Sequence, residues 1–232
     1  MGSRREFCKT LGAGIAVSLM PELIIAGTGD LPNVLILGDS ISIGYTELVR
    51  ELLKDQANVL RPMKENGKPM NCQGTTYGLK HIDAWLAASE WNVIHFNFGL
   101  HDLKHVDPET GRNSTNPDHP QQAGLKEYEK NLEQIVKKLK AISARLIFAT
   151  TTPFPDKPQG PLRRSDQAEK YNKVALKIMK KNDIIINDLY AYVLPRMEEL
   201  QKPNNVHFTS KGSEFLAEKV AWEIRRLLKS SM

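Results

Sequence analysis

The sequence predicts a single α/β domain built around a parallel β-sheet. From residue 31 onward, short apolar runs alternate with longer segments of helical periodicity, a pattern typical of β-α-β units. The 232 residues are 41% hydrophobic and 25% charged, the ordinary composition of a globular domain with a sizeable core. These observations exclude a collagen, a coiled coil and a disordered chain.

The apolar runs predict five strands and the periodic segments five helices. The strands are expected at residues 33–37, 57–60, 92–98, 145–150 and 184–186. The helices are expected near residues 43–54, 79–88, 122–142, 166–181 and 210–228. In the third helix, apolar residues recur every three or four positions, so one apolar face is expected to cover the sheet; they are Tyr128, Leu132, Ile135, Val136 and Leu139.

Two polar segments interrupt this pattern. Residues 103–120 are rich in Pro, Asp, Asn and Gly, and residues 152–162 carry four prolines. Both follow the carboxyl end of an expected strand, which is the edge where open α/β sheets bind their ligands. They are candidate walls of an active-site cleft, with plain surface connection as the alternative.

The first residues have the order of an export signal. Arg4 and Arg5 are followed by Phe7 and Lys9, and a mildly hydrophobic stretch covers residues 11–26. This resembles a bacterial twin-arginine signal, and the apolar stretch is too short and interrupted for a stable membrane span. We expect residues 1–27 to be the signal and residues 28–232 the exported domain, in the periplasm or outside the cell.

The charge pattern argues against nucleic acid as a partner. The net charge is +5, from 32 Lys and Arg against 27 Asp and Glu, but basic and acidic residues are interleaved along the chain. A nucleic-acid-binding protein concentrates its basic residues on one face. The two cysteines, Cys8 and Cys72, predict no disulfide framework.

Ser40 and His207 are candidates for nucleophilic catalysis. Ser40 follows the first expected strand and opens a helix, where backbone N–H groups stabilise negative charge. The alternative role for Ser40 is that of helix N-cap. His207 precedes the last helix and could reach across the carboxyl edge of the sheet as the base that serine needs.

Four sequence blocks resemble those of the SGNH hydrolases, the GDSL-type esterases and lipases: Gly38-Asp39-Ser40-Ile41, Gly74, Gly99-Leu100-His101-Asp102, and His207. The resemblance implies a flavodoxin-like, three-layer α/β/α fold with a five-stranded parallel sheet. It also implies that Ser40 is the nucleophile and His207 the base. The backbone N–H groups of Ser40 and Gly74 would then form the oxyanion hole. We expect no cofactor.

Two positions depart from the family pattern. His101 replaces an asparagine that donates to the oxyanion, and an imidazole N–H can take that role. Asn204 stands where an aspartate is usual, three residues before His207. We therefore expect a Ser-His dyad oriented by Asn204 or a backbone carbonyl, with Asp188 as an alternative acid.

The remaining polar residues are assigned supporting roles. Asp39 and Asp102 are expected to tie loops together through hydrogen bonds. Histidines at 95, 101 and 105 crowd near Asp102, but no metal-ligand spacing is present, so no metal site is expected.

The leading functional hypothesis is an exported serine esterase that removes small acyl groups, above all acetyl. Its substrate would be a carbohydrate ester or another small molecule. Two alternatives stay open: a carbohydrate-binding protein that kept the fold but is catalytically weakened, and an acyltransferase. The binding-protein alternative rests on His101 and Asn204.

Overall fold

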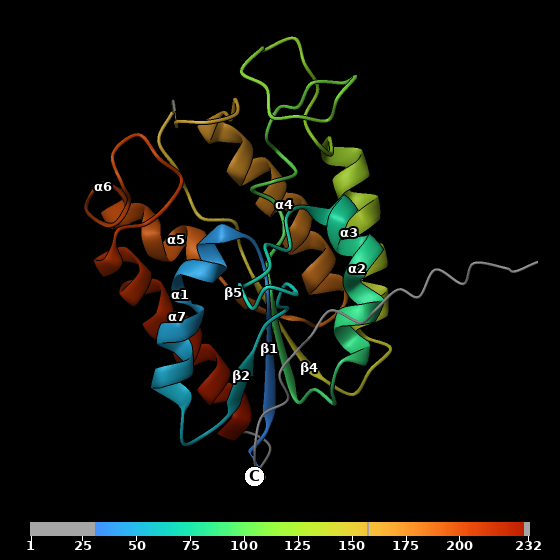
Figure 1. The fold of residues 1–232 in the computed structure, drawn as a ribbon, viewed down its shortest axis with the longest axis vertical. Coiled ribbons are helices and arrows are strands. Elements are labelled where there is room, and N and C mark those ends of the chain that lie inside the picture. The colour runs from blue at the N-terminus through green and yellow to red at the C-terminus, as the bar shows by residue number, and fades with distance from the viewer. Residues whose placement is uncertain (1–30, 157, 230–232) are drawn as a thin grey trace, which may run out of the picture.

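The computed structural model describes residues 31–156 and 158–229, so the expected export signal at residues 1–27 lies outside the described residues. A five-stranded parallel sheet of order β2-β1-β3-β4-β5 forms the centre, which confirms the predicted fold class (Figure 1). The strands are β1 (Asn33–Leu37), β2 (Asn58–Leu60), β3 (Val93–Phe96), β4 (Arg145–Ala149) and β5 (Ile185–Asn187).

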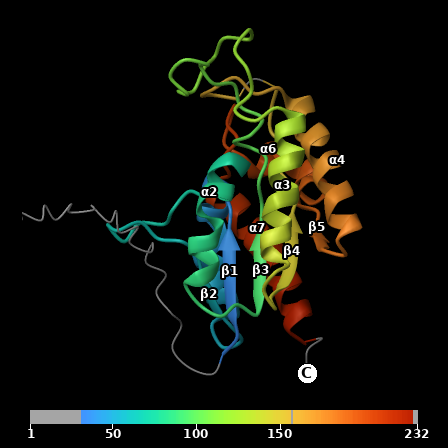
Figure 2. The same cartoon turned by 90° about the vertical axis from the view of Figure 1, so that its right-hand side faces the viewer.

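Helices cover both faces of the sheet and complete three layers (Figure 2). On one face α1 packs against α7, and on the other α3 packs against both α2 and α4. The first face carries α1 (Ser40–Leu53), α5 (Leu189–Val193) and α7 (Ser210–Lys229). The second carries α2 (Thr75–Ala87), α3 (Leu125–Leu139) and α4 (Ser165–Lys181).

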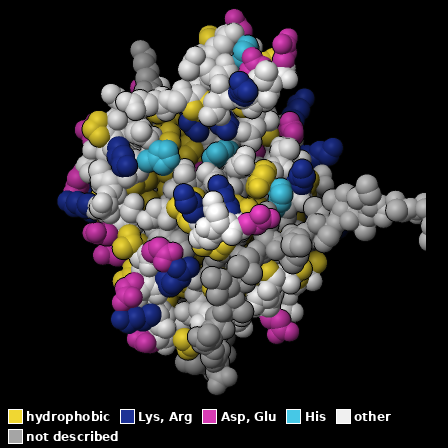
Figure 3. Space-filling model, in the orientation of Figure 1, with side chains coloured by type: hydrophobic (Ala, Val, Ile, Leu, Met, Phe, Trp, Pro, Cys, Tyr) yellow, Lys and Arg dark blue, Asp and Glu magenta, His cyan; other side chains and the backbone are white. Residues whose placement is uncertain are grey.

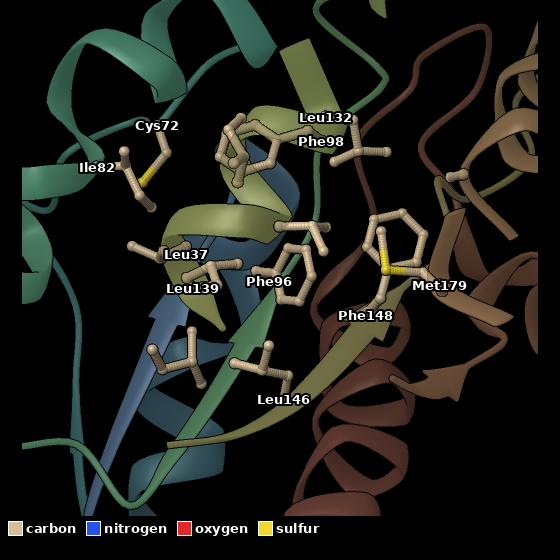
Figure 4. Close-up of a cluster of buried hydrophobic side chains, with 14 of the residues drawn as sticks. Leu37, Cys72, Ile82, Phe96, Phe98, Leu132, Leu139, Leu146, Phe148 and Met179 are labelled. Carbon is tan, nitrogen blue, oxygen red and sulfur yellow. The ribbon is translucent and has the colours of Figure 1, made fainter. Parts of the chain in front are cut away.

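Alternating side chains of the buried strands supply the two halves of the core. In β1, Val34 and Ile36 pack with the α1 and α7 side, while Leu35 and Leu37 pack with the α2 and α3 side. Figure 4 shows Leu37 with aromatic residues of the neighbouring strands beneath α3. The apolar stripe predicted for α3 is buried in this second cluster.

Three short helical segments were not predicted. They are α5, the 3₁₀ segment η1 (Leu194–Arg196) and α6 (Met197–Leu200). A helix of four or five residues is too short to show an apolar stripe of helical period, so periodicity does not detect it. These segments connect β5 to the turn of residues 202–207, which carries His207.

The sheet order changes direction between β1 and β3, which are neighbours. From β1 the chain moves outward to β2, then returns to the other side of β1 to form β3 and continues to β4 and β5. Ligand sites of open α/β sheets lie at such a switch point, outside the carboxyl ends of the strands. The segments that follow β1 and β3 are those of Ser40 and His101, and the loop of residues 103–120 rises above this edge (Figure 1).

Candidate active site

Ser40 and His207, which are 167 residues apart in the chain, meet at the carboxyl edge of the sheet. The Ser40 Oγ atom lies 2.9 Å from His207 Nε2. Ser40 is the first residue of α1, and His207 lies between α6 and α7. The structure thus brings together the two residues that the sequence analysis paired.

Asp39, rather than Ser40, is the N-cap of α1. Its side chain accepts a hydrogen bond of 2.8 Å from the backbone N–H of Ile41. Burial raises the pKa of Asp39, while this backbone hydrogen bond and the nearby Arg163 and Arg61 oppose the rise. Because Asp39 caps the helix, the Ser40 hydroxyl is available for its contact with His207. The Ser40 N–H lies in the first helical turn, where no intrahelical acceptor exists.

Asn205 determines which nitrogen of His207 carries the proton. Asn205 Oδ1 lies 2.7 Å from His207 Nδ1 and accepts the backbone N–H of His207 at 3.0 Å. A backbone N–H only donates, so the amide atom facing it is the oxygen, and the ring nitrogen facing the same oxygen must be Nδ1–H. Nε2 therefore holds the lone pair that can accept the Ser40 proton.

The pKa of His207 is below its ordinary value. Burial is the main cause, and the positive charges of Lys202 and Arg163 add to it. The imidazole is therefore neutral at neutral pH, which is the state a general base requires.

Neither Asn204 nor Asp188 contacts His207 in the way the sequence analysis expected. Asn204 adopts a left-handed backbone conformation with φ of 52°, and its carbonyl accepts the N–H of Gln159 at 2.6 Å. Asp188 is the N-cap of α5 and also accepts from Thr150 Oγ1 at 2.9 Å. Asn205, next to the expected position, makes the contact instead, because the turn at Asn204 directs the following side chain back toward the imidazole.

Asp102 holds the backbone at Gly74. Its Oδ1 accepts the N–H of Thr75 at 2.7 Å and also the Thr75 hydroxyl. A Cβ atom on Gly74 would lie 2.9 Å from the same oxygen, so a larger residue would displace the Asp102 carboxyl group. Burial raises the pKa of Asp102 to about 7, against the opposing effect of the Thr75 hydrogen bonds. Asp102 thus ties the segment after β3 to the start of α2, as the supporting role required.

His101 lines the pocket that opens beside Ser40. Burial, followed by the positive charges of Lys104, Arg163 and His207, lowers the pKa of His101 to about 3. The imidazole is therefore neutral near neutral pH, and it carries a single N–H. One N–H is what an oxyanion donor needs.

Two hollows meet at Ser40 and His207. One, of about 450 Å³, contains residues of both polar loops that were expected to wall the cleft; its described lining is Ser40, Asn71, Leu100, His101, Lys104, Asn113, Gln159, Gly160, Pro161, Arg163, Asn205, Val206 and His207. The other, of about 520 Å³, lies toward α1 and α7 and includes Ile41, Lys202 and Phe208. Figure 3 shows Lys, Arg and His side chains gathered around a hollow on this face.

The histidines at 95 and 105 lie outside this pocket. His95 is fully buried in β3, within 3.2 Å of the Asn187 side chain, and burial lowers its pKa to about 4. His105 Nδ1 contacts the carbonyl of His119 at 2.6 Å. Within residues 31–156 and 158–229, no group of three or more His, Cys, Asp or Glu side chains is arranged to hold a metal ion. No helix in this part of the chain is long and apolar enough to cross a membrane.

Sequence reasoning missed three residues of the site: Asn205, Lys104 and Arg163. Asn205 was not predicted, because the family pattern places the acid three residues before the histidine, at Asn204. Lys104 lies within the polar segment 103–120, and Arg163 directly follows the segment 152–162. A single cation in a loop has no sequence signature, so neither residue was singled out.

Comparisons with known proteins agree with the fold. The model of the GDSL-like Lipase/Acylhydrolase family matches residues 36–215. Among solved structures, an acetyl xylan esterase superposes with a TM-score of 0.64 at 18% identity, covering 83% of this chain and 98% of that one. A lipase/acylhydrolase from Enterococcus faecalis gives 0.65 at 20% identity, covering 84% and 96%. The acetylxylan esterase from Geobacillus stearothermophilus gives 0.63 at 18% identity, covering 83% and 94%.

At these identities the structural likeness establishes the fold, and no curated protein sequence matches the chain significantly. The family model covers most of the chain, from the end of β1 into α7. The protein therefore belongs to the GDSL-like lipase/acylhydrolase family, the SGNH hydrolases, and is a carboxylic ester hydrolase.

Proposed function

We propose that the protein is an exported serine esterase that removes small acyl groups, acetyl first, from carbohydrate esters. The observation that carries the mechanism is the chain of contacts from Asn205 Oδ1 through the His207 ring to Ser40 Oγ. It gives the serine a neutral base with its lone pair on the correct nitrogen.

In the first half-reaction, Ser40 Oγ attacks the ester carbonyl carbon while His207 Nε2 takes the hydroxyl proton. The carbonyl electron pair moves onto oxygen, and the backbone N–H groups of Ser40 and Gly74 and the His101 N–H donate to that oxyanion. The tetrahedral species then collapses. The bond to the alcohol oxygen breaks, and His207 gives its proton to the leaving alcohol.

In the second half-reaction, water attacks the acyl-Ser40 ester and gives a proton to His207. Collapse of the second tetrahedral species breaks the bond to Ser40 Oγ, which recovers the proton. The products are a carboxylic acid and the free enzyme. An alcohol in place of water would give acyl transfer, so the accessibility of the site to water decides between hydrolase and transferase.

The choice of substrate is supported by two observations. Polar segments line the pocket beside Ser40, including Asn71, Asn113 and Gln159, which suit a hydroxyl-rich substrate. Two of the solved structures with this fold carry the name acetyl xylan esterase. Export rests on the twin-arginine pattern at Arg4 and Arg5.

Labelling and turnover test this function. The protein should react with a fluorophosphonate probe and hydrolyse 4-nitrophenyl acetate, and Ser40→Ala and His207→Ala should each lower kcat by about 10³-fold or more. Glycerol added as an acceptor should leave free acetate as the main product. A folded wild-type protein that neither labels nor hydrolyses any acetyl ester would refute the proposal.

A further inference from the structure

Two buried cations, Lys104 and Arg163, line the pocket beside Ser40. Lys104 is 8% exposed and Arg163 is 7% exposed. Charged side chains are seldom buried this far without an opposite charge, because leaving water is costly for an ion. Neither residue forms a salt bridge within the described residues.

Backbone contacts hold the two cations near each other. The N–H of His105 donates to the carbonyl of Leu162 at 3.0 Å, so the segments that carry Lys104 and Arg163 run side by side. The pKa of Lys104 is lowered by burial first and then by the positive charge of Arg163. Burial lowers the pKa of Arg163 to about 10. With a pKa of about 10, Arg163 stays protonated at neutral pH.

The donors of both side chains remain available to the pocket. Arg163 uses Nε for a hydrogen bond of 3.1 Å to the carbonyl of Leu100, and its two terminal nitrogens have no acceptor in the described part of the chain. Lys104 Nζ likewise has no hydrogen-bond acceptor there. A planar guanidinium edge and an ammonium group side by side match the oxygens of a carboxylate, sulfate or phosphate.

The nearest acids do not neutralise this pair. Asp39 attracts Arg163, but it is engaged as the N-cap of α1. Asp102 attracts Lys104, but its carboxyl group is half protonated near pH 7 and is turned toward Thr75. No Asp or Glu is among the described residues that line the pocket. His101 and His207 complete a wall without a negative charge.

We propose that this pocket is a subsite for a negatively charged group of the substrate, so that the ester hydrolysed at Ser40 carries a carboxylate, sulfate or phosphate. The inference rests on the esterase function proposed above and narrows its substrate class. The anion can belong to the acyl part, as in a half-ester of a dicarboxylic acid, or to the alcohol part, as in an acylated acidic sugar.

Two substrate pairs distinguish these sources. For the acyl part, 4-nitrophenyl hydrogen succinate is compared with 4-nitrophenyl 4-methylpentanoate, which has the same shape without the charge. For the alcohol part, an acetylated methyl glucuronoside is compared with the acetylated methyl glucoside. The charged member of one pair should have a kcat/KM about tenfold or more above its neutral partner, mainly through KM.

The variant Lys104→Met keeps the aliphatic stem and removes the charge. It should reduce the charged-to-neutral ratio of kcat/KM to near one for the pair that shows the preference. Lys137→Met, on the exposed side of α3, is the matched control and should leave the ratio unchanged. Arg163→Lys, which keeps the charge but not the guanidinium edge, should reduce the ratio in part.

The outcomes separate this inference from the proposed function. If 4-nitrophenyl acetate is hydrolysed in a Ser40-dependent way but both ratios are near one, the subsite is refuted and the esterase stands. If no ester is hydrolysed, the esterase proposal fails, and calorimetry decides the subsite. Binding of succinate, glucuronate or sulfate that Lys104→Met abolishes would then support it, and no binding of any of the three would overturn it.

Discussion

Asn205 Oδ1 lies 2.7 Å from His207 Nδ1, on the side of the imidazole opposite Ser40. The same oxygen also accepts the backbone N–H of His207. A neutral amide here fixes the tautomer and orientation of the ring, although it stabilises the imidazolium less than a carboxylate would. In the proposed mechanism, Asn205 is thus a positioning residue for the base.

Two substitutions of Asn205 should distinguish its role in orienting the His207 ring from the effect of a negative charge beside that ring. Asn205→Ala should lower kcat by about 10²-fold or more, because Nδ1–H loses its acceptor and the wrong tautomer becomes accessible. Asn205→Asp should equal or exceed the wild type. The control is Asn204→Gly, since glycine suits the left-handed backbone at that position. Steady-state kinetics with 4-nitrophenyl acetate test this, and an equal loss in the control would contradict it.

The His101 N–H should be replaceable by another neutral donor. His101→Asn should retain most of kcat, whereas His101→Ala should lower it by about 10²- to 10³-fold with little change in KM. The pKa of His101 of about 3 means that its titration adds no limb to the pH profile near neutrality. A collapse of activity in His101→Asn, with the fold intact by circular dichroism, would show that the residue does more than donate.

The pH dependence of kcat/KM should follow His207. Its pKa is lowered by burial and by nearby positive charge, so activity should fall with decreasing pH only below the ordinary histidine value of about 6.5. Removing one of the positive neighbours through Lys202→Met should move this acidic limb upward. Lys137→Met is the control. An acidic limb above pH 6.5 in the wild type would contradict the prediction.

Asp102 should make the fold less stable as the pH rises. Its folded pKa of about 7 lies above the unfolded value of 3.8, so its contribution is fully present below about pH 4 and is lost as the pH rises through 7. Between pH 5 and 8 this amounts to about 3 kcal/mol, at ~1.4 kcal/mol per pKa unit. The free energy of unfolding in urea should therefore fall less with pH in Asp102→Asn than in the wild type. Parallel curves for the two proteins would contradict this.

Export can be tested with the N-terminal segment alone. Residues 1–35 fused to a reporter should direct it out of the cytoplasm of a bacterium with a twin-arginine pathway. Arg4→Lys together with Arg5→Lys should retain the reporter in the cytoplasm, whereas Lys9→Gln should not. Export that is insensitive to the arginine pair would assign the segment to another route.

The local pattern of the sequence predicted most of the fold. The strand at residues 33–37 was predicted with its observed bounds, and the other strands within one or two residues. Such elements can be predicted because the spacing of apolar residues indicates which face of the strand or helix is buried. The short helices α5 and α6 were missed, since their few residues carry no period and depend on contacts with distant segments.

The sequence by itself determined the β-α-β order, the candidate nucleophile and base, and the blocks around Ser40, Gly74, His101 and His207. These features depend on neighbouring residues in the chain. Only the tertiary structure decided that Asn205 rather than Asn204 orients His207, and that Lys104 and Arg163 share one pocket. Both depend on how turns and loops direct side chains after the sheet has assembled, as the left-handed backbone at Asn204 does for Asn205.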